Sequence, residues 1–141
     1  MANEAVLMIE TELPISMTCD NATGIEKGTI CKITDPFTAV KADGTDDLIA
    51  GIAAGEKIAS NGDTEIEIYR GGFFKVVISG RITVGDQVGV DGNSLADNLV
   101  ISNRATAALS GSKILGIAME TGADGETILI ELRPHAINSY V

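Results

Sequence analysis

The chain has 141 residues, and 45% of them are hydrophobic, which is enough for one domain of ordinary size with a substantial core. Ten basic residues against twenty acidic ones give a formal charge of −10, which argues against binding to nucleic acid or to an anionic membrane surface. Tryptophan is absent and other aromatic residues are few, so we expect a core of Ile, Val, Leu, Ala and Met. No apolar run is long enough to span a membrane, and the first ten residues lack the basic start of a secretory signal.

The first half of the chain favours strands. Residues 5–19 are apolar and β-prone, with Pro14 marking an edge or a bend. Residues 43–59 contain enough alanine to suggest a helix, but Gly51 and Gly55 argue against it. Residues 63–70 alternate strictly between apolar and acidic side chains, which is typical of a half-buried strand.

The second half continues in the same way. Residues 73–82 are rich in β-formers and are interrupted at Ser79-Gly80, and a short strand at Val88–Val90 precedes a hairpin signal at Asp91-Gly92. Only residues 103–113 lean towards a helix, so we expect at most one short helix near 104–110. Residues 127–133 alternate again, except that an apolar side chain interrupts the polar face.

Three motifs occur twice, in the same order. Each is short, but three matches in sequence favour a duplicated unit over chance. The matched segments are 25–33 with 82–90, 49–53 with 114–118, and 62–64 with 125–127. The sequence therefore predicts an all-β fold, a compact barrel or sandwich of short strands with a pseudo-twofold internal repeat.

The repeat suggests a division of the chain. Residues 1–24 form an N-terminal strand or arm, and residues 25–141 form a single β domain made of two similar modules, at about 25–70 and 82–133. Glycines recur where such a module turns or bends, because a glycine in a strand marks a bulge or the close approach of another backbone. The predicted turn and bend positions are Gly51, Gly62, Gly85, Gly116 and Gly125.

No constellation of catalytic residues is present. The two cysteines, Cys19 and Cys31, lack the spacing of a zinc or redox motif, and ordinary buried thiols are the default, although the sequence leaves a disulfide open. The acidic run at 43–47 resembles the start of a calcium loop, but Ala54 stands where the bidentate Glu would be needed. We therefore assign no catalytic residue, no cofactor and no metal site, and expect no enzyme.

In the order of these motifs, the chain resembles the capsid decoration proteins of tailed phages, which are also called head-stabilising or cement proteins. The resemblance covers about 25–133. It depends on the Gly-Ile-Ala strand at 51–53, the Gly-Gly-Phe-Phe segment at 71–74 and the closing strand at 125–130.

The resemblance implies a non-enzymatic virion protein that binds the outer surface of the capsid as a homotrimer and stabilises the shell. Its partners would be the major capsid protein and further copies of itself, with no nucleic acid and no membrane. It would be made in the host cytoplasm. The −10 charge agrees independently, because an acidic chain near the packaged genome would be repelled by it.

One apolar run at the chain start has no counterpart in the repeat. It is either an ordinary first strand of the fold or an arm that adds a strand to a capsid edge. The candidate capsid contacts are Ala5, Val6, Leu7, Met8 and Ile9.

Two other functions stay open at this point. A ligand- or receptor-binding β module of a virion, like part of a fibre, would need exposed aromatic side chains, which are scarce. A small enzyme on a β-barrel would need a perturbed pair of carboxylates, for which the sequence shows no sign.

Overall fold

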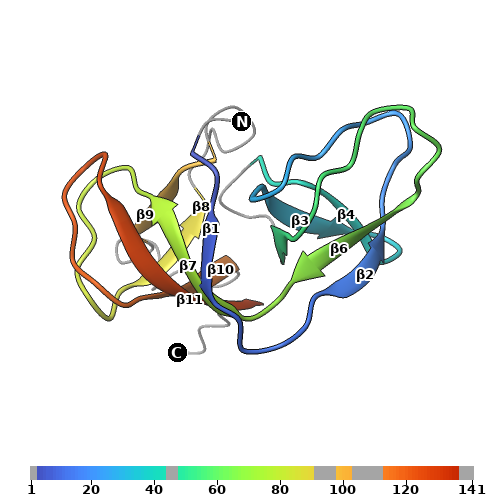
Figure 1. Cartoon of the computed structure of the whole chain (residues 1–141). Helices are drawn as coiled ribbons and strands as arrows, with labels where there is room; N and C mark the ends of the chain where they lie inside the picture. The colour runs from blue at the N-terminus through green and yellow to red at the C-terminus, as the bar shows by residue number, and fades with distance from the viewer. Residues whose placement is uncertain (1–2, 44–47, 91–97, 103–112, 137–141) are drawn as a thin grey trace.

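A computed structural model describes residues 3–43, 48–90, 98–102 and 113–136, and within these ranges the chain forms strands and no helix (Figure 1). The predicted all-β fold is therefore confirmed, whereas the short helix expected near 104–110 lies outside the described residues. No described helix could cross a membrane. The strands are β1 (Val6–Ile9), β2 (Ile15–Thr18), β3 (Ile30–Thr34), β4 (Thr38–Lys41), β5 (Ile49–Ala53), β6 (Glu65–Tyr69), β7 (Gly72–Val77), β8 (Gln87–Val90), β9 (Val100–Ser102), β10 (Lys113–Ala118) and β11 (Thr127–Ala136).

Five strands form a closed barrel in the order β2-β4-β3-β5-β6. The alternation in β6 explains its inner and outer faces, because Ile66 and Ile68 are buried inside while Glu65 and Glu67 are exposed. The barrel interior is apolar and includes Met17 of β2, together with both cysteines.

The other six strands form a sheet in the order β1-β7-β11-β10-β8-β9. This sheet curls back on itself, since Ile78, just after β7, forms a parallel bridge with Val100 of β9. The arrangement leaves β1 as an additional strand along the first half of β7 (Figure 1).

The two sheets repeat the same hydrogen bonds at matching positions. In the barrel, Ile25 and Lys57 exchange both backbone bonds, at 2.9 and 2.7 Å. In the second sheet, Ile82 and Gly122 do the same, at 3.0 and 2.9 Å. These bonds support the division into modules at 25–70 and 82–133, which remains a prediction.

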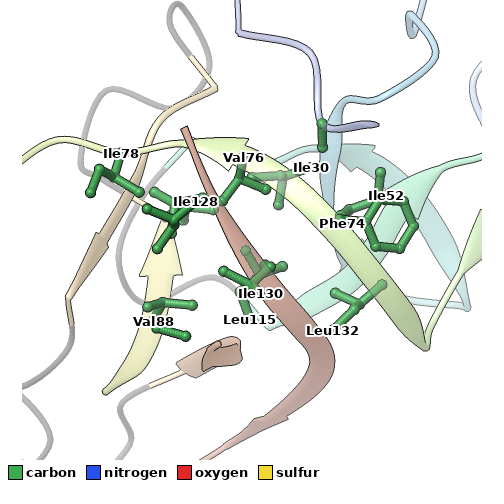
Figure 2. Close-up of a cluster of buried hydrophobic side chains, with 14 of the residues drawn as sticks. Ile30, Ile52, Phe74, Val76, Ile78, Val88, Leu115, Ile128, Ile130 and Leu132 are labelled. Atoms are coloured by element: carbon green, nitrogen blue, oxygen red, sulfur yellow. The ribbon is translucent and has the colours of Figure 1, made fainter. Parts of the chain in front are cut away.

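The larger core lies where the sheet packs against the barrel. Figure 2 shows Ile30 and Ile52, which come from the barrel strands β3 and β5, beside Phe74 and Ile130 of the second sheet. All four side chains are at most 2% exposed. One continuous apolar core therefore joins the two halves.

The alanine-rich stretch 43–59 contains a strand, as its glycines suggest. All five residues of β5 are buried, because the strand lies between β3 and β6 and packs on both faces. A strand covered on both sides has no need of alternation, which is why this segment lacks a β-type pattern.

The glycines singled out in the sequence lie in two kinds of place. Gly62, Gly85 and Gly125 lie in connections between strands, with φ values of 93°, 91° and 83°. Gly51 lies within β5 with φ of 144°, and Gly116 lies within β10.

Candidate capsid-binding surface

The apolar run at the start of the chain forms β1, which pairs antiparallel with β7. Val6 lies opposite Lys75 and Leu7 opposite Phe74, and the register shifts before Ile9. The segment is thus an ordered edge strand of the sheet, as the first of its two interpretations has it, and its contact with a capsid stays a prediction.

The five candidate contact residues divide between two sides of β1. Ala5 is buried and Leu7 packs against the core. Val6, Met8 and Ile9 are 50%, 54% and 55% exposed, respectively. The structure therefore separates a side that holds the strand in place from a side that is free to meet a partner.

A groove of about 280 Å³ runs beside β1, between the sheet and the barrel. Its walls combine polar and apolar surface in about equal share and include one acidic and one basic residue. They consist of Glu4, Ala5, Val6, Leu7, Lys27, Ala53, Ala54, Tyr69 and Phe74. Val6 belongs both to the groove and to the exposed side of β1, so the two adjoin.

Asn98 fixes the start of the chain against the barrel. Its side chain is buried and donates to the carbonyl oxygens of Asn3 and Gly28, both at 3.0 Å, while its Oδ1 accepts from the Ile30 N–H at 2.9 Å. The Ala5 N–H also donates to Gly28, at 3.1 Å. This role could not be predicted from the sequence, because a single Asn between strands has no distinctive pattern.

Tyr69 forms part of the groove wall on the barrel side. Its hydroxyl donates to the Glu10 carboxylate at 2.7 Å, and this hydrogen bond, aided by burial, raises the pKa of Tyr69. Its ring meets Phe74 edge to face, with centroids 5.7 Å apart and planes at 65°. The wall beneath β1 is therefore held in one conformation.

The same part of the chain carries further exposed apolar side chains that the sequence analysis did not single out. Leu13 is 75% exposed and Ile15 is 39% exposed, in the connection to β2 and at its start. Leu13 and Ile15 follow the exposed side of β1 in the sequence and are further candidates for contact with a partner.

The carboxylates and thiols of the described residues do not gather at this surface as a set of metal ligands. Among the described residues, no group of three or more His, Cys, Asp or Glu side chains could hold a metal ion. Cys19 and Cys31 are free and buried, and burial raises the pKa of the Cys31 thiol to about 12. Both thiols therefore serve as apolar packing groups in the barrel.

Comparison with known proteins identifies the family to which the chain belongs. A family model described as phage cement protein matches residues 9–134, while no curated protein sequence matches. Among solved structures, the N base of head fibre gp8.5 in bacteriophage phi29 shares the fold, with a TM-score of 0.54 at 15% identity over 88% of this chain and 98% of that one. The chain therefore belongs to the phage cement protein family, whose members are virion components at the outer surface of the capsid.

Proposed function

We propose that this protein is a non-enzymatic capsid decoration protein that binds the major capsid protein as a homotrimer and stabilises the shell. The observation that carries the proposal is the exposed apolar side of β1, formed by Val6, Met8 and Ile9, of which Val6 also lines the groove. Membership in the cement family supports association with the capsid.

The exposed side of β1 has the properties of a binding surface. Full burial of one Val, Ile or Met side chain is worth about 1.5–3 kcal/mol, so three of them could supply a large share of an adhesive contact. The strand is already ordered by its pairing with β7 and by the bond from Ala5 to Gly28. Binding would therefore cost little further conformational entropy.

Charge limits how the copies could meet. Three chains of −10 each would carry −30 (3 × −10) in a trimer. Their mutual contact must then be mainly apolar, and an interface of standard size buries about 800 Å² on each partner. The same charge favours the outer face of the shell, away from the genome.

The binding test uses emptied, expanded phage heads and measures how much protein sediments with them. The triple variant Val6→Thr, Met8→Gln and Ile9→Thr keeps the strand and the inward residues, and we expect it to bind at least tenfold more weakly. The matched control is Ile58→Thr with Val84→Thr, two substitutions at side chains of similar exposure in other connections. Equal binding by the triple variant and the control would remove β1 as the contact.

Sedimentation equilibrium of the free protein tests the oligomer. A mass three times that of the chain supports the trimer, and a monomer at the concentrations that saturate heads contradicts it. Stabilisation is tested by heating DNA-filled heads with and without bound protein, and the decorated heads should release DNA at a higher temperature. Substitutions are preferable to truncation, because removing β1 would also uncover Phe74.

A further inference from the structure

The barrel strand β2 occupies the position that β7 occupies in the second sheet. β2 pairs antiparallel with β6 just as β7 pairs with β11, so that Ile15 opposite Ile68 corresponds to Phe74 opposite Ile130. Beyond the strand ends, the Cys19 N–H donates to Thr64 as the Ile78 N–H donates to Glu126. Position 15 of the barrel is thus the counterpart of position 74 in the sheet.

The two strands differ in what lies along their other edge. The first half of β7 is covered by β1, and Leu7 lies opposite Phe74, which is only 2% exposed. Along β2, the described residues pair at Thr18 with β4 and nothing described pairs with the preceding residues, so Ile15 is 39% exposed. The barrel therefore has an open strand edge at residues 13–16, which we call the β2 edge. At the corresponding place in the sheet, the edge of β7 is covered by the apolar strand β1.

The backbone of the β2 edge is oriented for pairing. The Thr18 N–H donates away from β6, to the Phe37 carbonyl, whereas the Cys19 N–H donates towards β6. Because donors alternate along a strand, the Ser16 N–H points to the same side as that of Thr18. Ser16 thus presents a backbone donor to the open edge, as Lys75 does to β1 in the sheet.

Pro14 lacks an N–H, which limits pairing but does not prevent it. Its counterpart in β7 is Phe73, and the ladder between β1 and β7 shifts register at that point, between Leu7 and Ile9. The N–H that Pro14 lacks therefore falls at the position where the corresponding pairing of β1 with β7 is already irregular. Proline at this position also blunts the edge against indiscriminate pairing.

We propose that the β2 edge is a strand-addition site that takes an extended segment of the major capsid protein, antiparallel to β2, in the way that β7 takes β1. This proposal depends on the proposed function. The segment would place an apolar side chain opposite Ile15 and a Lys or Arg on the outer face, where Glu65 and Glu67 are exposed on the far side of β2. A second copy of this chain fits less well, because it would bring a further charge of −10 to an acidic edge.

A pair of variants at Ser16 tests the site. Ser16→Pro removes the outward donor without breaking a bond to β6, whereas Ser16→Ala keeps the donor and changes only the side chain. We expect Ser16→Pro to bind emptied, expanded heads at least tenfold more weakly and Ser16→Ala to bind as the native protein does. Thermal unfolding of both variants confirms that each is folded. Hydrogen exchange of the native protein gives a second measure: the amides within residues 13–17, from which Pro14 is absent, should exchange more slowly on heads than in the free protein, above all the outward amide of Ser16.

The outcomes separate this inference from the proposed function. Failure of the native protein to bind heads overturns both. Normal binding by Ser16→Pro, with no added protection of residues 13–17, overturns the β2 edge alone and leaves the exposed side of β1 as the contact. Protection of these amides in the free protein that grows with its concentration identifies a second copy as the occupant, and also overturns the assignment to the capsid protein.

Discussion

Gly51 and Gly116 hold the same place in the two sheets, each packed against a carbonyl oxygen of the neighbouring strand. A Cβ at Gly51 would overlap the carbonyl oxygen of Tyr69, and one at Gly116 would overlap that of Glu131. Each glycine also lies at an irregularity, since β3 and β5 shift register beside Gly51 and β10 and β11 shift beside Gly116. The two bulges let the strands curve, and both require a residue without a side chain.

Alanine at either glycine should destabilise the fold. We expect Gly116→Ala to lower the free energy of unfolding by about 1–3 kcal/mol through overpacking. Gly51→Ala should cost more, because φ of 144° at that position adds strain to the same collision. The measurement is urea unfolding followed by circular dichroism. Gly55→Ala is the control, since a Cβ there meets nothing within 4 Å, and an equal loss in all three variants would contradict the account.

Lys57 stabilises the barrel although it is charged and buried. Its ammonium donates to the carbonyl oxygens of Asn21 and Ile58, at 2.9 and 2.6 Å, and the residue is 2% exposed. Lys57→Met would leave two buried acceptors without this donor, and we expect a loss of about 1–3 kcal/mol in unfolding free energy. Lys27→Met, at an exposed lysine, is the matched control and should stay within about 0.5 kcal/mol of the native protein. A neutral Lys57→Met would show that water replaces the ammonium at no cost.

Burial of Cys31 should make the protein less stable in alkali. Its thiol pKa is raised from 9.0 to about 12 by desolvation, so the folded state keeps a proton that the unfolded state loses. The contribution is complete below pH 9 and is lost as the pH rises towards 12, at up to about 1.4 kcal/mol per pH unit. Unfolding free energies of the native protein and of Cys31→Ala, compared from pH 7 to pH 10.5, test this. The native curve should fall more steeply than that of the variant above pH 9, and parallel curves would refute the linkage.

The sequence predicted the parts of the fold that depend on periodicity and turns. The alternation at 63–70 located β6 and its buried face, and the β-rich pattern agrees with a five-stranded barrel and a second sheet, while the division into two similar modules stays a prediction. Pairing between distant segments leaves no local signal, so the sequence could not show that β1 covers Phe74 or that Asn98 fixes the start of the chain. It identified residues 5–9 as a candidate surface, but which of them face outward depends on that pairing.

Substitutions on the two sides of β1 should affect different properties, namely the stability of the fold and the binding to heads. Leu7 packs against the core opposite Phe74, so Leu7→Ala should lower the unfolding free energy by about 1–3 kcal/mol, somewhat less than for a fully buried leucine. Val6→Thr changes only an exposed side chain and should leave stability within about 0.5 kcal/mol of the native value while it weakens binding to heads. Denaturant unfolding and head sedimentation, both below the unfolding transition, measure the two effects. Because Leu7 contacts the core and Val6 contacts solvent, Leu7→Ala should mainly lower stability and Val6→Thr should mainly weaken binding. A Val6→Thr variant that loses stability but binds heads normally would show that β1 serves the fold alone.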